Sequence, residues 1–520
     1  MILGQTSAQH VAMLSRAGRT TLDDLFRRAA GRRPEAIALA DPPNRESVTG
    51  GPPRRLTYAQ ADRMISAIAD RLRRLGLHAD EIVGLQMANT VDGVLTLLGI
   101  LRAGLIATPL PLLWRQADCV HALGRVGAKA LIMSARIGSA DHCTLAMHVA
   151  ADVFHIRHVG GFGRDLPDGV VGFDDLYEAA ALDPVTPIAR SINPAGHIAV
   201  VTWDVAPAGL VPVARSHLEL IAAGAAVTLE SRIEQTASIL SSLAMPSFAG
   251  LALTVMPWLL TGGTLSLHHP FDDAVFSGQC KDERCAAAIV PGPLAQKLCD
   301  AGAFSRLNGL KTVIAAWRTP ERVAGSAGWR DPAIALTDVS MFGETALLAA
   351  RRIGNGRPPG LALGPYSVPR GAPGALHVAE IACTAAATLA IGGPMVPKFP
   401  FRSTADVEPE PRFRVSEEGF ADTGYGCQID PDTRLVSLTA PPPGIVSVGG
   451  YRFAVQALEE LGAQAGGTLA AVPDALGGQR LAGSASDAGR VRQDLDARGA
   501  NPLVVEAFRA AETDDQRAAG

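Results

Sequence analysis

Cysteine thiols have the most reactive chemistry available in this sequence, since thiolates bind zinc and exchange with disulfides. The seven cysteines are scattered over the 520 residues, and no two have the Cys-x-x-Cys spacing of a zinc ribbon or a redox motif. The nearest pair, Cys280 and Cys285, fits neither pattern. We therefore predict buried, reduced thiols in a cytoplasmic protein, without a metal centre.

Histidine, serine and glycine patterns indicate no separate reaction centre either. The 12 histidines include the adjacent pair His268 and His269, but no His-x-x-x-His spacing occurs, so we interpret the pair as a surface turn. The chain has no Gly-x-Ser-x-Gly sequence, which argues against a hydrolase. Gly354–Gly360 loosely resembles a dinucleotide-binding loop, but it lacks the strand–turn–helix context and is predicted to be a surface loop.

The elements that must position any site alternate between helices with one apolar face and short apolar strands. This alternation predicts an α/β fold with mostly parallel sheets covered by helices. Thr20 or Thr21 is predicted to cap the first of these helices, which carries two aspartates in its first turn. The predicted helices are 21–30, 59–75, 91–103 and 116–126, and the predicted strands are 37–41, 82–87, 105–108 and 129–133.

An uncharged stretch from Gln235 to Phe271 is long enough to span a bilayer. Two prolines and the pair Gly262-Gly263 interrupt it, so we predict no membrane span. We interpret the stretch as a buried helix at 248–260 followed by a core strand at 264–267. The N-terminal residues lack a basic segment followed by a long apolar run, so secretion is not expected.

Composition and length indicate a folded chain of more than one domain. Hydrophobic residues make up 48% and charged residues 19%, which excludes a mainly disordered chain. The net charge of −4 argues against a general nucleic-acid binder. The prolines of Ala440–Gly444 form the sharpest break, because three in a row continue neither a helix nor a central strand. We predict a large N-terminal domain at 1–440 and a small, shortened α/β domain at 441–520.

Six short segments, in this order and spacing, together resemble the adenylate-forming superfamily of acyl- and aryl-CoA ligases, peptide-synthetase adenylation domains and luciferases. The resemblance extends from Thr20 to Glu459 and implies a large multi-sheet N-terminal domain with a small C-terminal lid. Members of the superfamily join a carboxylate to ATP and then pass the acyl group from AMP to a thiol. The segments are Leu56–Asp62, Arg215-Ser216-His217, Leu260–Leu265 before Phe271-Asp272, Phe342–Thr345, Asp422-Thr423-Gly424 before Ile429-Asp430, and Gly449–Arg452 before Leu458-Glu459.

At the position of the phosphate loop, the resemblance predicts poor triphosphate binding. The superfamily has a loop rich in glycine, threonine and serine that ends in a lysine, where this chain keeps only Thr202 and Gly209. The lysine position falls on Val211 or Pro212, and Asp204 adds a negative charge beside the expected phosphates. Two prolines also remove backbone N–H donors from this segment.

The expected nucleotide contacts are only partly kept elsewhere. By the resemblance, Phe342, Gly343, Glu344 and Thr345 occupy the adenine and phosphate segment, but the glutamate expected to bind Mg²⁺ is Ala346. Glu344 is interpreted either as a substitute metal ligand or as a solvated surface carboxylate. At the ribose position, an aspartate is replaced by Tyr425, whose phenol can make one hydrogen bond but not a bidentate pair.

The hinge and the lid also depart from the superfamily. The arginine expected at the hinge is missing from Ala440–Gly444, and three prolines there should resist rotation of the lid. No lysine follows Lys398, so the catalytic lysine of the lid is absent; Arg480 and Arg509 are the cations considered as replacements. The resemblance implies that Phe248 and Gly250 line an acyl or aryl pocket, with core packing as the equally open alternative.

Two hypotheses of function follow. The first is a catalytically degraded ligase-like protein, or pseudoenzyme, that binds an acyl, aryl or adenylate-like ligand, or a protein partner, and needs no cofactor. Any residual nucleotide contacts would come from the retained residues Thr202, Gly209, Phe342, Gly343, Glu344, Thr345 and Tyr425. The alternative is an active AMP-forming carboxylate–CoA ligase with relocated catalytic groups, which would require ATP, Mg²⁺ and CoA.

Overall fold

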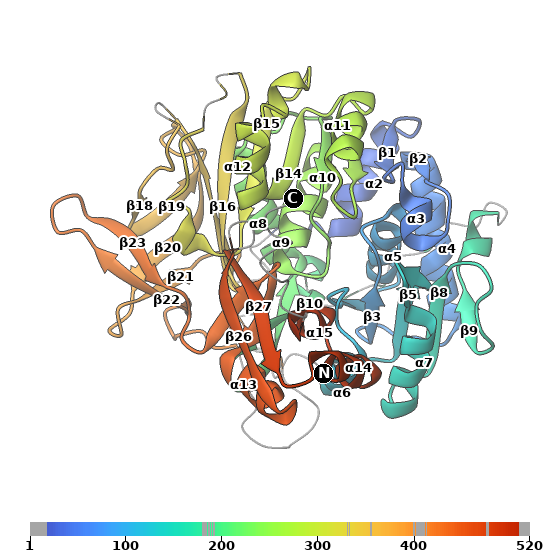
Figure 1. The fold of residues 1–520 in the computed structure, drawn as a ribbon. Coiled ribbons are helices and arrows are strands. Elements are labelled where there is room, and N and C mark those ends of the chain that lie inside the picture. Colours follow the sequence, from blue (N-terminus) through green and yellow to red (C-terminus); the bar gives the residue numbers. More distant parts are fainter. Residues whose placement is uncertain are drawn as a thin grey trace.

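The structure is a computed structural model that describes residues 18–178, 185, 188, 190, 193–329, 331, 333–353, 356–398, 401, 411, 413–474 and 478–508. Among these residues, three large sheets are stacked against helices, and the C-terminal elements lie beside them near α6 (Gln116–Val126) (Figure 1). The predicted α/β class with a small C-terminal unit is therefore confirmed.

The first sheet has eight strands in the order β17-β16-β15-β14-β12-β13-β1-β2. Its six central strands, from β16 to β1, run parallel, and an antiparallel strand closes each edge. The strands are β1 (Ile37–Ala40), β2 (Arg55–Thr57), β12 (Ser238–Ser241), β13 (Thr264–Leu267), β14 (Ala287–Pro291), β15 (Thr312–Trp317), β16 (Ala335–Phe342) and β17 (Ala346–Arg351).

The second sheet has seven strands in the order β11-β10-β4-β3-β5-β8-β9, and only β11 runs antiparallel to its neighbour. The predicted preference for parallel pairing is thus confirmed in both of these sheets. The strands are β3 (Ile82–Gln86), β4 (Ile106–Pro109), β5 (Ala130–Ser134), β8 (His158–Phe162), β9 (Val170–Gly172), β10 (Ile198–Ala206) and β11 (Gly209–Ser216).

The third sheet has six strands, all antiparallel, in the order β18-β23-β22-β21-β20-β19. Its strands are β18 (Leu361–Ala362), β19 (Gly364–Val368), β20 (Leu376–Cys383), β21 (Thr388–Gly392), β22 (Phe420–Ile429) and β23 (Leu435–Ala440).

One apolar core joins all three sheets through the helices between them. The helix α5 (Val91–Arg102) is buried along its whole length, as its mostly apolar sequence dictates. The helices α2 (Leu22–Arg32) and α4 (Tyr58–Arg74) present one apolar face to this core and begin with capping boxes at Thr21 and Thr57. The predicted N-terminal helices and strands therefore form, with boundaries shifted by at most two residues.

Outer helices cover the remaining sheet faces. The helices α6 and α7 (His142–Asp152) pack on the second sheet, and α11 (Asp273–Asp282) and α12 (Gly292–Asp300) pack on the first. The helix α8 (His217–Glu230) contacts β17 and the third sheet, and the short α3 (Arg45–Thr49) contacts β6 (Arg136–Ile137), which pairs with β7 (Ala140–Asp141).

The uncharged stretch forms buried structure. The helix α9 (Phe248–Gly250) leads through a π-helical turn at Leu251–Val255 into α10 (Met256–Thr261), and β13 follows. The predicted helix and strand are confirmed, and within the described residues no helix combines the length and apolarity that a membrane crossing requires.

The surface turn predicted at His268 is wrong: this side chain is 0% exposed, because Nδ1 contacts Gln279 and the ring packs against Phe276. Gly354 and Asn355, within the predicted surface loop, lie outside the described residues.

The elements after the three prolines have an apolar cluster of their own, built around Leu458, Leu469 and Phe508. They comprise the hairpin β24 (Ile445–Val448) and β25 (Tyr451–Ala454), the hairpin β26 (Gly467–Asp474) and β27 (Gly478–Ala485), and the helices α13 (Val455–Gln464), α14 (Ala488–Ala497) and α15 (Pro502–Val505). The boundary at residue 440 remains a prediction.

Candidate functional site

A tight β-hairpin occupies the segment in which a phosphate loop was expected. Strands β10 and β11 pair continuously from Thr202↔Val213 to Ala206↔Gly209, leaving only Pro207 and Ala208 as the turn. Backbone groups within such a ladder bond to the partner strand, whereas a phosphate-binding loop needs several free N–H groups that converge on one point. The hairpin therefore has little backbone left with which to bind a triphosphate.

Both carboxylate oxygens of Asp204, on this hairpin, accept hydrogen bonds from groups of the protein itself. One oxygen accepts hydrogen bonds from Arg452 at 2.8 Å and from the backbone N–H of Val205 at 2.8 Å. The other oxygen accepts the backbone N–H of Glu344 at 2.9 Å. Gly343 makes room for this contact, because a Cβ at its position, where φ is +57°, would lie 2.4 Å from Asp204 Oδ2.

Arg452 links the C-terminal hairpin to two positions of the expected nucleotide site. Besides Asp204, its guanidinium donates to the hydroxyl of Tyr425 at 2.8 Å. Burial alone would lower the pKa of Arg452, but the charges of Asp204 and Tyr425 and the hydrogen bonds to both side chains together outweigh burial and raise it. The guanidinium is therefore a permanent cation whose charge is neutralised by Asp204. In the sequence, Arg452 stands out only as part of the landmark Gly449–Arg452.

The rings of Phe342 and Tyr425 cover each other. They meet edge to face, with centroids 5.5 Å apart and planes at 90°, and each residue is 1% exposed. A flat ligand ring could reach Phe342 only after Tyr425 moved. Burial raises the pKa of the Tyr425 hydroxyl, so this side chain stays a neutral partner of Arg452.

Glu344 lies inside the protein, in the turn between β16 and β17, and is 6% exposed. Its carboxylate accepts the backbone N–H of Phe248 at 2.6 Å, and burial followed by the charge of Asp204 raises its pKa. The interpretation of Glu344 as a solvated surface carboxylate is therefore wrong. The neighbouring Thr345 is also 6% exposed, and Thr202 is fully buried in β10, where its hydroxyl has no hydrogen-bond partner of normal geometry among the described residues.

Arg215 holds this inward turn in place, which sequence reasoning did not foresee. It is 0% exposed and donates to the carbonyls of Glu344, Thr345 and Met395. Its guanidinium carbon lies 3.6 Å from the ring centroid of Phe248. Burial lowers the pKa of Arg215 to about 10, so the group remains charged. The ring of Phe248 thus makes a cation–π contact with the buried guanidinium of Arg215.

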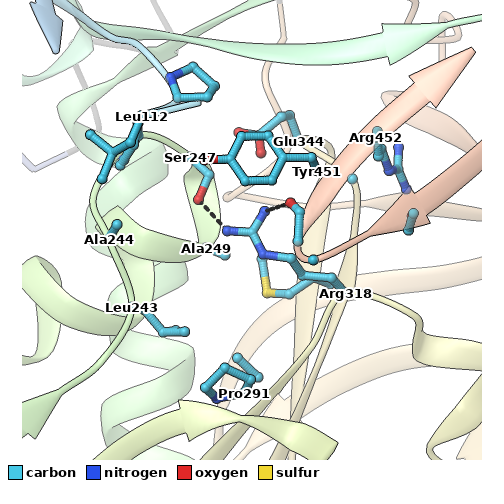
Figure 2. Close-up of a pocket in the computed structure, with 18 of the residues that line it drawn as sticks. Leu112, Leu243, Ala244, Ser247, Ala249, Pro291, Arg318, Glu344, Tyr451 and Arg452 are labelled. Atoms are coloured by element: carbon cyan, nitrogen blue, oxygen red, sulfur yellow. Dashed lines mark hydrogen bonds between the residues drawn. The ribbon is translucent and has the colours of Figure 1, made fainter. Parts of the chain in front are cut away.

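A cavity of about 530 Å³ opens beside these residues. Figure 2 shows apolar side chains, including Leu112, Leu243 and Ala249, along its wall, with Ser247 and Arg318 near its centre. Asp204, Glu344 and Arg452 reach the same cavity, as does Tyr451 from β25. Its residues therefore come from the first sheet, from the β10–β11 hairpin and from the C-terminal segment.

Phe248 and Gly250 lie behind this wall, whereas their neighbours Ser247 and Ala249 form part of it. A Cβ at Gly250 would lie 2.0 Å from the carbonyl oxygen of Ala244, so this glycine permits close packing of two backbone segments. Whether the cavity takes an acyl group remains a prediction.

A second cavity, of about 770 Å³, lies between the C-terminal elements and the N-terminal part of the chain. Gly209 borders it at the end of the β10–β11 hairpin, together with residues of α6, α13 and α14. Of the two proposed replacement cations, Arg480 is exposed on β27 and lines neither cavity, whereas Arg509 lies outside the described residues.

The residues present do not fit ATP with Mg²⁺. The expected metal ligand is replaced by Ala346, which is 0% exposed in β17, and the Glu344 carboxylate is engaged by a backbone N–H. The described residues contain no cluster of three or more His, Cys, Asp or Glu side chains placed to hold a metal. The pairing of Asp204 with Arg452 also leaves no net positive charge at the hairpin to attract a triphosphate.

Comparison with known proteins identifies the part of the sequence that has recognisable relatives. Residues 26–185 match the family model described as AMP-binding enzyme. A long-chain fatty acid transport protein 1 of Bos taurus is 31% identical over 122 residues, which cover 24% of this chain and 18% of that protein. A salicyl-AMP ligase / salicyl-S-ArCP synthetase of Mycobacterium tuberculosis is 29% identical over 175 residues, or 34% of this chain and 30% of the relative. The chain thus matches less than a third of the length of either relative.

Solved structures match nearly the whole chain. The amide bond synthetase McbA from Marinactinospora thermotolerans has a TM-score of 0.68 at 18% identity, covering 94% of both chains. MbtA of Mycobacterium smegmatis has a TM-score of 0.64 at 20% identity, covering 97% of this chain and 93% of the other. The anthranilate CoA ligase AuaEII, solved with anthranoyl-AMP, has a TM-score of 0.62 at 15% identity, covering 96% and 93%. At these identities the likeness shows a shared fold.

Proposed function

We propose that the chain is a member of the adenylate-forming superfamily that binds a small carboxylate or acyl ligand without converting it into an adenylate. The match of residues 26–185 to AMP-binding enzymes and the shared fold support this proposal. The ligand occupies the cavity of about 530 Å³, a volume within the usual range of small-molecule sites. The protein is then a ligand-binding relative of acyl- and aryl-CoA ligases.

The ion pair between Asp204 and Arg452 is the observation that carries this proposal. Arg452 is the cation that the β24–β25 hairpin brings to the β10–β11 hairpin. In this pair, its charge is neutralised by the carboxylate of Asp204. Adenylate formation requires positive charge around the leaving pyrophosphate. At the β10–β11 hairpin, where Asp204 neutralises Arg452, the protein supplies no such stabilisation.

The proline segment supports the same proposal, because it is packed against the N-terminal part on two sides. A Cβ at Gly424 would lie 3.1 Å from Pro442, and a Cβ at Gly444 would lie 3.3 Å from Pro207 in the hairpin turn. Rotation of the C-terminal segment would have to break both contacts and the Asp204–Arg452 pair. This packing opposes the large lid motion that a two-step ligase needs.

Exchange of labelled pyrophosphate into ATP tests the proposal, with salicylate, anthranilate, benzoate and octanoate as acids. We expect no exchange above the blank without acid. Thermal denaturation in the same buffers provides a second measurement: the acid that binds should raise the midpoint, and MgATP should not. Carboxylate-dependent exchange would show that the chain is an active ligase with relocated catalytic groups and would overturn the proposal.

A further inference from the structure

Among the described residues that line the cavity, Arg318 is the cationic side chain that makes no ion pair. It follows β15 directly, and its guanidinium donates to Ser247 Oγ at 2.8 Å and to the carbonyl oxygen of Gly450 at 3.0 Å (Figure 2). Both acceptors are neutral. Within the described residues no carboxylate oxygen lies within ion-pair distance of Arg318, and two of its five N–H groups are used by these bonds.

The other charged groups at the cavity are already engaged. Arg452 is paired with Asp204, and the carboxylate of Glu344 accepts a hydrogen bond from the Phe248 backbone. Burial raises the pKa of Glu344, which favours its neutral form, and burial lowers the pKa of His269, which favours the neutral imidazole. The Tyr451 phenol accepts the N–H of Leu113 and has a raised pKa through burial.

Burial disfavours the charged form of Arg318 and therefore lowers its pKa. An arginine nevertheless remains protonated near neutral pH. A half-buried cation that makes no ion pair, and whose cost of burial the charges of Glu344 and Asp204 offset only in part, raises the free energy of the protein, and an incoming anion would relieve that cost. A guanidinium with free N–H groups matches the two oxygens of a carboxylate.

We propose that Arg318, with the hydroxyl of Ser247, is the anchor for the carboxylate of a free monocarboxylic acid whose apolar body lies along Leu243, Ala249 and Pro291. This inference rests on the proposed ligand-binding function and deepens it by naming the chemical form of the ligand. The ionised acid binds, whereas the corresponding amide, of the same shape but without charge, binds poorly.

Titration calorimetry without nucleotide tests the anchor, with benzoate and octanoate as probes and with benzamide and octanamide as uncharged counterparts. We expect each acid to bind at least about tenfold more tightly than its amide, since hydrogen bonds to charged groups contribute more than neutral ones. Arg318→Gln should remove this preference by weakening the acids about 10- to 100-fold while changing the amides little. Arg318→Lys should retain part of it, because an ammonium keeps the charge but not the fork.

Arg322→Gln is the matched control, since Arg322 is an exposed cation in the turn Pro320–Arg322 on the same segment and does not line the cavity. It should leave the preference for acids intact. Circular dichroism and thermal denaturation establish that each variant is folded. If Arg318→Gln does not fold, Ala249→Leu tests the position of the ligand, because a larger side chain in the wall should weaken acid and amide alike.

Equal binding of acid and amide by the native chain, or an unchanged preference in folded Arg318→Gln, would overturn the anchor. Absence of acid binding by the native chain would do the same. An undiminished affinity of Ala249→Leu for both probes would overturn the location. These outcomes are distinguishable from those of pyrophosphate exchange. Exchange with an intact Arg318 preference overturns only the non-adenylating function, and absence of exchange with equal binding of acid and amide overturns only the anchor.

Discussion

Asp204 Oδ1 and Arg452 Nη1 lie 2.8 Å apart, although the two residues are 248 positions apart in the sequence. The pair joins the β10–β11 hairpin to β25, and the same guanidinium reaches Tyr425 on β22. Three parts of the fold thus meet at one cation. Because both members of the pair are only 14–16% exposed, solvent weakens their attraction less than it would at the surface.

We predict that Arg452→Gln destabilises the attachment of the C-terminal segment. The substitution leaves the partly buried carboxylate of Asp204 without its cation and the Tyr425 hydroxyl without its charged donor, so the unfolding free energy should fall by about 2–4 kcal/mol. Chemical denaturation measures the loss.

Arg480→Gln provides the control for this experiment, because Arg480 is exposed on β27 in the same segment. Its effect should stay within about 0.5 kcal/mol. Asp204→Asn combined with Arg452→Gln should be less damaging than the sum of the single changes, with a coupling of about 1 kcal/mol or more. Strictly additive effects would contradict a direct role of the pair.

A second prediction concerns the dependence of stability on pH through His217. This side chain is 8% exposed, and its Nδ1 accepts the backbone N–H of Leu22 at 3.3 Å. Burial, followed by the charge of Arg190, lowers its pKa from 6.5 to about 3 in the folded protein. The unfolded chain therefore takes up a proton below about pH 6.5 that the fold excludes, so this contribution to stability is complete above that pH and is lost as the pH falls toward the folded pKa.

Replacing His217 with asparagine, which retains an acceptor near Nδ1, removes this titration. Between about pH 7 and about pH 5, the native chain should lose about 2 kcal/mol more unfolding free energy than His217→Asn, from about 1.4 kcal/mol per pH unit below the unfolded pKa. His78→Asn, at an exposed histidine, is the control for the substitution itself. Equal slopes for His217→Asn and the native chain would refute the assignment.

Local sequence rules predicted the elements well because the signals were local. The capping box at Thr57 and the apolar spacing of α4 lie within one helix, and the parallel strands are short apolar runs between helices. The landmark Leu260–Leu265 likewise corresponds to the end of α10 and the start of β13.

The site was less predictable because its contacts join distant segments. Glu344 is buried by Arg215 and Phe248, about 100 residues or more before it in sequence, and no local pattern distinguishes it from a surface carboxylate. Arg318 stands next to a proline-containing turn like many surface arginines. Only the fold places it in a cavity, where it makes no ion pair with any described residue. Loss of a lysine can be read from a sequence, whereas closure of the phosphate segment into a hairpin requires the strand pairing.

The last prediction concerns Gly263, where the retained scaffold is most closely packed. Its carbonyl accepts hydrogen bonds from Tyr58 at 2.7 Å and from Trp258 Nε1 at 3.1 Å, and a Cβ at this position would lie 1.8 Å from the carbonyl oxygen of Ala237. Because that oxygen belongs to the backbone, Gly263→Ala must displace the chain and should lower the unfolding free energy by about 3 kcal/mol or more. Gly278→Ala, in α11 with nothing within 4 Å of the added Cβ, should be neutral or stabilising by up to about 1 kcal/mol. Chemical denaturation of both variants decides the matter, and equal stability of the two would show that the backbone at Gly263 yields more easily than this packing implies.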